Sequence, residues 1–312
     1  MSSNGIRGVM VPILTPFTPD EKVDFGSLGR LVDYLLDNGV HGIWAAGTTG
    51  EFSALEDEQR LAAIEAVVDR VAGRVPIIAN VSATSTEAAV KMGLAMKGIA
   101  VDGIAATPPY YFPCAQDELL AHFRYIKDRV GLPLWIYNIP VTVKTSVDPA
   151  TTAQLAEEGT VAGIKDSSGT GELHAQLVML CEQRGIDLYR FLGSTFRVST
   201  ASAVGAHGVI PNIANLVPAI TAASWEAGEA GDIEKAREFD AKLVVALKVQ
   251  KLAKGGGPNA AVLSGVKSAL VALGVIDHDH VSRPLRPLTD DEKHHIPAIL
   301  KELGLSASVG VS

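Results

Sequence analysis

Cysteine is scarce in this sequence, which holds only Cys114 and Cys181 among its 312 residues. Two cysteines so far apart form neither a disulfide framework nor a zinc site, and they are typical of a protein in a reducing compartment. The first residues, MSSNGIRG, contain no long apolar run, so we expect no signal peptide. Together these features predict a cytoplasmic protein.

Three further absences narrow the class of protein. No stretch reaches the roughly 18 uninterrupted apolar residues of a membrane span, so we expect no membrane partner. The net charge of −8 argues against a nucleic-acid or anionic-membrane surface, although a local site on an acidic protein can still bind a small anion. Clustered metal ligands are also missing, and we interpret the histidines near the C-terminus as surface groups: His278, His280, His294 and His295. We therefore expect no metal and no cofactor.

Short apolar runs at regular intervals dominate the first three quarters of the chain. Each is bounded by Gly, Pro or Asn and followed by a segment with helical periodicity. The runs are apolar on both faces, as expected of parallel strands covered on both sides. The eight runs occupy residues 8–17, 42–47, 76–82, 103–109, 133–138, 161–166, 190–194 and 207–213. Eight strand–helix units predict a (β/α)8 TIM barrel over residues 1–228.

An open doubly wound sheet is the structural alternative. It has little support in its dinucleotide-binding form, because no G-x-G-x-x-G opens a helix after the first strand. Residues 229–312 hold no strand-like run, and we predict a C-terminal helical region there. Its three expected helices cover residues 233–253, 259–273 and 290–303, and KGGGPN at 254–259 separates the first two.

The chemically interesting residues follow the apolar runs. In a TIM barrel the carboxyl ends of the strands form the active site, so these residues converge on one mouth. They lie in GTTGE (47–51), TPPYY (107–111), YNIP (137–140), KDSS (165–168) and GST (193–195). An apolar barrel interior would lower the pKa of Lys165 and leave a neutral, nucleophilic amine. Such an amine forms a Schiff base with a ketone, while a tyrosine moves protons and a Gly-rich turn binds a carboxylate.

Each of these residues also has an ordinary structural interpretation. A lysine at a strand end is usually solvated or ion-paired, and Tyr137 could be a core aromatic. The GTTG segment could be only a turn, and Tyr110 with Tyr111 only a packing or interface pair. What favours function is that all of them fall at one rim of the expected barrel.

Five motifs occur in an order that resembles the dihydrodipicolinate synthase / N-acetylneuraminate lyase family of pyruvate-dependent class I aldolases. They are GTTGE, TPPYY, YNIP, GIKD (163–166) and HGVI (207–210), and the similarity extends from about residue 6 to 303. The resemblance implies a lyase with a TIM barrel, usually a homotetramer built as a dimer of dimers. Its substrates would be a 2-oxo acid, pyruvate, and an aldehyde, with no cofactor beyond the lysine–pyruvate Schiff base.

The resemblance also implies roles for individual residues. Lys165 corresponds to the Schiff-base lysine and Tyr137 to the tyrosine beside the imine. Thr48 and Thr49 correspond to the residues that bind the pyruvyl carboxylate, and we assign Thr49 also to a hydroxyl relay with Tyr111, which in the family reaches into the neighbouring subunit's site. Gly193 and Ile210 correspond to residues that line the pyruvate pocket.

Two departures from the family bear on the substrate. Synthases of the family carry an arginine two residues after YN-x-P that holds the aldehyde's carboxylate, whereas this chain has Thr142, which cannot form a bidentate fork. Sialic acid lyases carry an acidic pair after the seventh-strand glycine, whereas this chain has Ser194 and Thr195. The remaining hydroxyls, including Thr142 and Ser167, suit a polyhydroxylated substrate. The sequence therefore favours an aldolase acting on a 2-keto-3-deoxy sugar acid, or a related 2-oxo-acid lyase.

Other functions remain open from the sequence. The same Schiff base could serve 4-hydroxy-tetrahydrodipicolinate synthesis from pyruvate and aspartate semialdehyde, or the dehydration of a deoxy-keto acid. A non-catalytic keto-acid sensor is the alternative outside enzymology. The intact set of Lys165, Tyr137 and Thr48–Thr49 argues against a sensor, because binding alone needs no proton relay.

Overall fold

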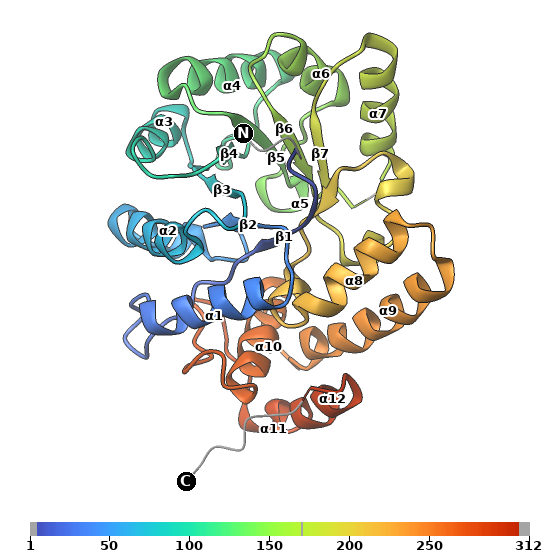
Figure 1. Cartoon of the computed structure of the whole chain (residues 1–312). Coiled ribbons are helices and arrows are strands. Elements are labelled where there is room, and N and C mark those ends of the chain that lie inside the picture. Colours follow the sequence, from blue (N-terminus) through green and yellow to red (C-terminus); the bar gives the residue numbers. More distant parts are fainter. Residues whose placement is uncertain (1–4, 170, 306–312) are drawn as a thin grey trace.

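The computed structural model describes residues 5–169 and 171–305, and it contains a closed barrel of eight parallel strands (Figure 1). The ends of the predicted ranges, residues 1–4 and 306–312, lie outside the described residues. The strands are β1 (Gly8–Pro12), β2 (Gly42–Ala45), β3 (Ile77–Asn80), β4 (Gly103–Ala106), β5 (Leu134–Asn138), β6 (Gly163–Asp166), β7 (Tyr189–Leu192) and β8 (Gly208–Val209). Each falls within, or one residue outside, a predicted apolar run, so the predicted barrel is confirmed.

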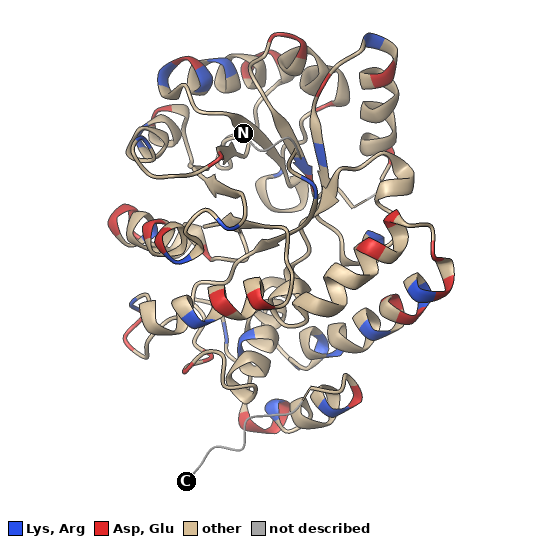
Figure 2. Cartoon of the chain, in the orientation of Figure 1, with Lys and Arg blue, Asp and Glu red and all other residues tan. Residues whose placement is uncertain are grey.

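Helices surround the barrel, and the charged residues lie mainly on these outer helices (Figure 2). They are α1 (Phe25–Asp37), α2 (Asp57–Val71), α3 (Thr86–Ala95), α4 (Gln116–Val130), α5 (Pro140–Val143), α6 (Pro149–Glu157), α7 (Glu172–Arg184) and α8 (Pro218–Glu229). Short 3-10 helices follow several strands: η1 (Phe52–Ala54), η2 (Thr195–Arg197), η3 (Ser202–Val204) and η4 (Asn212–Asn215). The short α5 was not expected from the sequence, and it carries Thr142.

Alternate strands fill the barrel interior with large side chains and with glycines. In the strand register, large residues of odd-numbered strands stand beside glycines of even-numbered strands: Met10 beside Gly42, Ile78 beside Gly103, Trp135 beside Gly163, and Phe191 beside Gly208. A Cβ at Gly163 would lie 2.6 Å from the Trp135 ring, so only glycine leaves room there. Two residues further along β6, on the same face of the strand, comes Lys165. This packed layer is the floor on which the site is built.

The C-terminal region lies on one side of the barrel, next to α1 and α8 (Figure 1). It comprises α9 (Ile233–Ala246), η5 (Leu247–Lys251), α10 (Pro258–Ala272), α11 (Asp290–Lys293) and α12 (Ile296–Glu302). The predicted boundary at 228 falls one residue before the end of α8, and the division into two parts stays a prediction. One hydrophobic cluster contains both Trp225 of α8 and Leu270 of α10, so the core continues across that boundary.

Two of the three predicted C-terminal helices are wrong in extent. The helix expected over 233–253 ends at Ala246 and tightens into η5, which brings Gln250 against Asn212 (Nε2–Oδ1, 3.0 Å). The helix expected over 290–303 divides into α11 and α12. Pro297 at the start of α12 explains the break, because proline lacks the amide that would donate to the Lys293 carbonyl in a continuous helix. The predicted helix 259–273 matches α10 to within one residue.

Candidate active site

Lys165 projects from β6 into the barrel interior with only 3% of its surface exposed. Its Nζ lies 4.2 Å from the centroid of the Tyr137 ring and 5.0 Å from that of Trp44. Within the described part of the chain no carboxylate forms an ion pair with it. Burial disfavours the cation and lowers the pKa of Lys165 to about 7. A substantial fraction of this amine is therefore neutral near pH 7.

Tyr137 of β5 is the strand neighbour of Lys165, and its side chain is also buried. Its hydroxyl shares a hydrogen bond of 3.1 Å with Oγ1 of Thr48, in the turn after β2. Burial raises the pKa of Tyr137 to about 12, although the hydrogen bond with Thr48 acts in the opposite direction. The phenol is thus protonated at neutral pH and can give a proton to a group beside Lys165 while Thr48 replenishes it.

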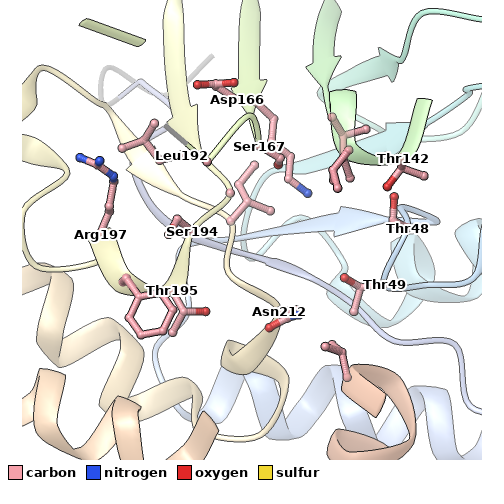
Figure 3. Close-up of a pocket in the computed structure, with 18 of the residues that line it drawn as sticks. Thr48, Thr49, Thr142, Asp166, Ser167, Leu192, Ser194, Thr195, Arg197 and Asn212 are labelled. Carbon is pink, nitrogen blue, oxygen red and sulfur yellow. The ribbon is translucent and has the colours of Figure 1, made fainter. Parts of the chain in front are cut away.

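A cavity of about 390 Å³ opens above Lys165 at the carboxyl ends of the strands (Figure 3). Most of the residues predicted from the sequence line this cavity: Thr48, Thr49, Tyr137, Thr142, Lys165, Ser167, Ser194, Thr195, Gly193 and Ile210. The predicted site therefore forms one continuous space. Its floor is the apolar barrel interior, and its upper wall carries several hydroxyl groups among apolar side chains such as Phe196 and Leu263.

The loop after β6 places the side chains of the adjacent residues Ser167 and Ser168 in different surroundings. The Asp166 carboxylate accepts hydrogen bonds from Asn138 Nδ2 (3.1 Å) and from both the amide and the hydroxyl of Ser168 (3.0 Å each). The Ser168 hydroxyl is thus occupied, whereas Ser167 lines the cavity. A Cβ at Gly193 would lie 2.1 Å from Ser167 Oγ, so the glycine makes room for that hydroxyl. The Asp166 network orients the strand end from which Lys165 projects.

Four cavity-lining residues with long polar or carboxamide side chains were missed from the sequence. They are Arg197 of η2, Asn212 of η4, Gln250 of η5 and Asn259 of α10. Arg197 lies across the cavity from Thr142 (Figure 3), and its guanidinium packs over Gly171. Asn212 could have been predicted, because it follows β8 and residues that follow a barrel strand lie at the mouth of the barrel. Gln250 and Asn259 give no such signal, because they come from helices outside the barrel.

A sequence profile of the dihydrodipicolinate synthetase family matches residues 5–303 of the chain. The chain belongs to this family of lyases. The resemblance inferred from the five motifs is thereby confirmed, and a non-catalytic sensor is set aside.

Several members of the family are similar over nearly the whole chain. The 4-hydroxy-tetrahydrodipicolinate synthase of Caldicellulosiruptor bescii is 37% identical over 283 residues, which cover 91% of both chains. A structure described as the first monomeric dihydrodipicolinate synthase variant has 30% identity and a TM-score of 0.86, covering 96% of this chain and 97% of its own. The family protein YagE of E. coli K12, solved in complex with pyruvate, has 25% identity and a TM-score of 0.87, covering 97% of this chain and all of its own (100%).

The predicted hydroxyl relay between Thr49 and Tyr111 stays a prediction. Thr48 supplies the hydroxyl that contacts Tyr137. Adjacent residues of a turn point in different directions, so only one of the two threonines faces Tyr137, and no hydrogen bond joins Thr49 to Tyr111 within residues 5–169 and 171–305. Tyr111 does not line the cavity of its own chain; it is 78% exposed and its ring contacts Phe112. Its proposed action in a neighbouring subunit stays a prediction.

Thr142 and Lys144 are the two residues near the position at which an arginine would bind the second substrate. Thr142, on α5, lines the cavity at the place where family synthases carry arginine. Lys144 adopts left-handed backbone (φ 61°) and donates from Nζ to the Val141 carbonyl (2.8 Å). It does not line the cavity, so it does not replace the missing arginine.

Neither a metal site nor a membrane segment is found in the described residues. No group of three or more His, Cys, Asp or Glu side chains there could hold a metal ion. No helix of residues 5–169 or 171–305 is long and apolar enough to cross a membrane.

Proposed function

We propose that this protein is a Schiff-base lyase that cleaves a 2-keto-3-deoxy sugar acid to pyruvate and an aldehyde, or joins the two. The observation that carries the proposal is the buried, unpaired Lys165 with its Nζ over the Tyr137 ring, at the floor of a hydroxyl-lined cavity. A Schiff base needs a neutral amine, and an environment that disfavours the ammonium supplies one.

The residues divide the reaction among themselves. The Lys165 amine adds to the C2 carbonyl of the 2-oxo acid, and loss of water leaves a protonated imine. Removal of the C4 hydroxyl proton lets the C3–C4 bond break, so that its electron pair enters the imine and the aldehyde departs. The resulting enamine takes a proton at C3, and water then releases pyruvate and restores Lys165. Tyr137, backed by Thr48, is positioned to move these protons.

Two elements of the turn after β2 support binding of the substrate's carboxylate. Thr49 lines the cavity beside Thr48, and the turn that holds both is closed by a hydrogen bond from the Glu51 amide to the Thr48 carbonyl (3.1 Å). Hydroxyl and amide donors fixed in this way stabilise an anion without a metal. Ile210 and Gly193 complete the apolar side of the pyruvate half of the cavity.

The distal half of the cavity supports the choice of substrate. Its hydrogen-bonding groups are mostly neutral hydroxyls and carboxamides: Thr142, Ser167, Ser194, Thr195, Asn212, Gln250 and Asn259. Such groups pair with the hydroxyls of a sugar acid and would be left unpaired by a shorter, less polar aldehyde. The guanidinium of Arg197 is the cationic exception on this wall.

The second candidate is 4-hydroxy-tetrahydrodipicolinate synthase, which condenses pyruvate with aspartate semialdehyde. The name of the Caldicellulosiruptor relative favours it, and Arg197 could receive the aldehyde's carboxylate in place of the absent arginine. A dehydratase using the same imine is a third outcome.

A substrate panel tests the proposal. Purified protein is incubated with individual 2-keto-3-deoxy aldonic acids, and pyruvate release is followed with Lys165→Ala as the control. We expect pyruvate from at least one sugar acid and none from the variant. Substantial turnover of aspartate semialdehyde with pyruvate, and none of any sugar acid, would replace the proposal by the synthase.

We also propose that the protein is a cytoplasmic homotetramer. The exposed rings of Tyr111 and Phe112 support association, because paired aromatic side chains are common at subunit interfaces. Free thiols at Cys114 and Cys181 suit a reducing compartment. Since one relative is described as monomeric, light scattering of the purified protein is the direct test, and a monomer would refute the tetramer.

A further inference from the structure

A buried ion pair joins the turn that carries Thr48 and Thr49 to the C-terminal region. Glu51 and Lys267 have side chains that are 2% and 0% exposed, and Nζ of Lys267 lies 2.5 Å from Oε1 of Glu51. Glu51 closes the turn after β2, whereas Lys267 lies in α10, 216 residues further along the chain. Neither residue lines the cavity above Lys165.

Every polar atom of this pair has a partner. Lys267 donates a second hydrogen bond to the His280 carbonyl (2.8 Å) and stands 4.2 Å from the Phe17 ring centroid. The other oxygen of Glu51 accepts from the amide and the hydroxyl of Ser282, both at 2.7 Å. A carboxylate whose two oxygens both accept hydrogen bonds is fixed in position, and it restrains the backbone of its own residue.

The backbone of Glu51 belongs to the turn that carries Thr48 and Thr49. Glu51 has left-handed backbone (φ 55°), which a residue with a side chain adopts only when its surroundings impose it. Its amide donates a hydrogen bond to the Thr48 carbonyl (3.1 Å). The hydroxyl of Thr15 donates another to the carbonyl of Gly50, the residue before Glu51 (2.7 Å). The direction of the Thr48 side chain toward Tyr137 therefore depends on the conformation that Glu51 is made to keep.

Stability alone is a weak reason for such a pair. Desolvating two charges offsets much of their attraction, and apolar side chains of similar size would often serve the fold as well. A geometric role explains the pair better, since an ion pair with directional bonds fixes a position that apolar packing leaves loose.

We propose that Glu51 and Lys267 are positioning residues for the reaction, through which the C-terminal region fixes the Thr48–Thr49 turn against Tyr137. This inference rests on the proposed Schiff-base function. It also assigns a task to α10 and to the segment around Ser282, which lie outside the barrel.

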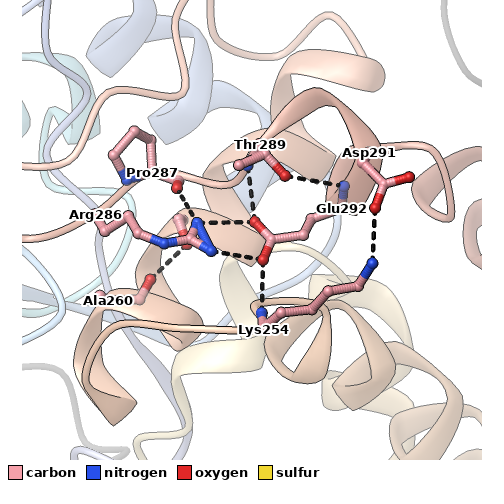
Figure 4. A network of polar contacts seen from close by, with 8 residues as sticks. Lys254, Ala260, Arg286, Pro287, Thr289, Asp291 and Glu292 are labelled. Atoms are coloured by element: carbon pink, nitrogen blue, oxygen red, sulfur yellow. Dashed lines mark hydrogen bonds and ion pairs between the residues drawn. The ribbon is translucent and has the colours of Figure 1, made fainter.

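A matched pair of substitutions tests the inference. Glu51→Gln is compared with Glu292→Gln. Glu292 is another buried carboxylate of the C-terminal region, held by the Arg286 guanidinium (2.6 and 2.8 Å) and by the Lys254 amide (2.6 Å) in a network that includes neither Thr48 nor Thr49 (Figure 4). Both changes remove one charge and one acceptor from a buried network. Lys267→Met removes the other partner of the first pair.

Active sites are counted before rates are compared. Reduction with borohydride in the presence of pyruvate adds mass at Lys165 and gives the number of competent sites in each sample. We expect kcat per site to fall about 100-fold in Glu51→Gln and Lys267→Met, because a displacement of about 1 Å has that effect on catalytic groups. We expect KM for the sugar acid to rise as well, since Thr49 belongs to the same turn. Glu292→Gln should lower Tm and leave kcat per site within twofold of wild type.

The outcomes separate the two hypotheses. If Glu51→Gln and Lys267→Met keep wild-type kcat and KM per site, the positioning role is refuted. If either fails to fold, Ser282→Ala decides instead: it removes one hydrogen bond to Glu51 and leaves the ion pair, and an unchanged kcat per site would equally refute the role. A wild-type protein without a pyruvate adduct at Lys165 refutes the proposed function itself.

Discussion

Lys165 and Tyr137 are register partners on adjacent parallel strands, and the Nζ of the lysine lies 4.2 Å from the tyrosine ring. Register fixes the relative height of the two side chains in the barrel, so their proximity does not depend on any loop. The tyrosine contributes twice: its ring helps to exclude water from the amine, and its hydroxyl, held by Thr48, is available for proton transfer.

The pH dependence of Schiff-base formation should reflect the amine. Burial lowers the pKa of Lys165 to about 7, so the reactive neutral form is depleted as the pH falls below this value. We expect the initial rate of borohydride trapping with pyruvate to drop about tenfold per pH unit below pH 6 and to level off above pH 8. A midpoint near pH 10 would show that the lysine keeps an ordinary pKa.

Replacing the lysine should stabilise the fold. The folded pKa of Lys165 lies below the ordinary lysine value of 10.5, so the unfolded chain binds this proton more tightly. The resulting destabilisation is complete below about pH 7 and disappears as the pH rises toward 10.5. We expect Lys165→Met to raise the free energy of unfolding by ~2–4 kcal/mol at pH 7 and by less than ~1 kcal/mol at pH 10.

Urea denaturation at the two pH values checks this expectation. Lys301→Met, at an exposed position, is the control, and it should change the unfolding free energy by less than ~0.5 kcal/mol at either pH. Equal stability of Lys165→Met and wild type at pH 7 would contradict the desolvation argument.

The two threonines of the turn should affect different steps. Thr48 contacts the Tyr137 hydroxyl, whereas Thr49 only faces the cavity. We expect Tyr137→Phe and Thr48→Val to lower kcat by about 10²–10⁴-fold, the usual contribution of a proton-transfer group. Thr49→Val should mainly raise KM for pyruvate in the condensation direction. Steady-state kinetics of the three variants distinguish these effects, and a large loss of kcat in Thr49→Val alone would return the relay to Thr49.

Arg197 should determine which second substrate is accepted. It is the cation on the distal wall, opposite Thr142. We expect Arg197→Gln to raise KM about 10-fold or more for substrates with a carboxylate at their far end, because a charge-assisted hydrogen bond is lost. Substrates with a terminal hydroxyl should be affected less. An equal effect on both classes, measured as kcat/KM, would assign Arg197 to structure instead of recognition.

The barrel and the place of Lys165 at the end of its sixth strand could be predicted from the sequence because both follow from local patterns. Apolar runs of strand length predict the strands, and the topology then gathers the residues after them. The contact of Thr48 with Tyr137 was not predicted, because sequence order does not give the direction of a side chain within a turn. Gln250, Asn259 and Arg197 escaped detection because they reach the cavity through 3-10 segments and through helices packed against the barrel from outside. Long-range packing of that kind has no periodic signature.

Gly163, the first residue of the GIKD motif, matters for the site although it has no side chain. A side chain at this position would displace the Trp135 ring, so Gly163 preserves the apolar packing of the barrel interior two residues before Lys165. Loss of the lysine's reactivity can therefore arise from a mutation in a residue with no functional group at all. For protein engineering, the loops at the carboxyl ends of the strands are the place to change the substrate range, whereas the glycines of the packed layer below them should be kept.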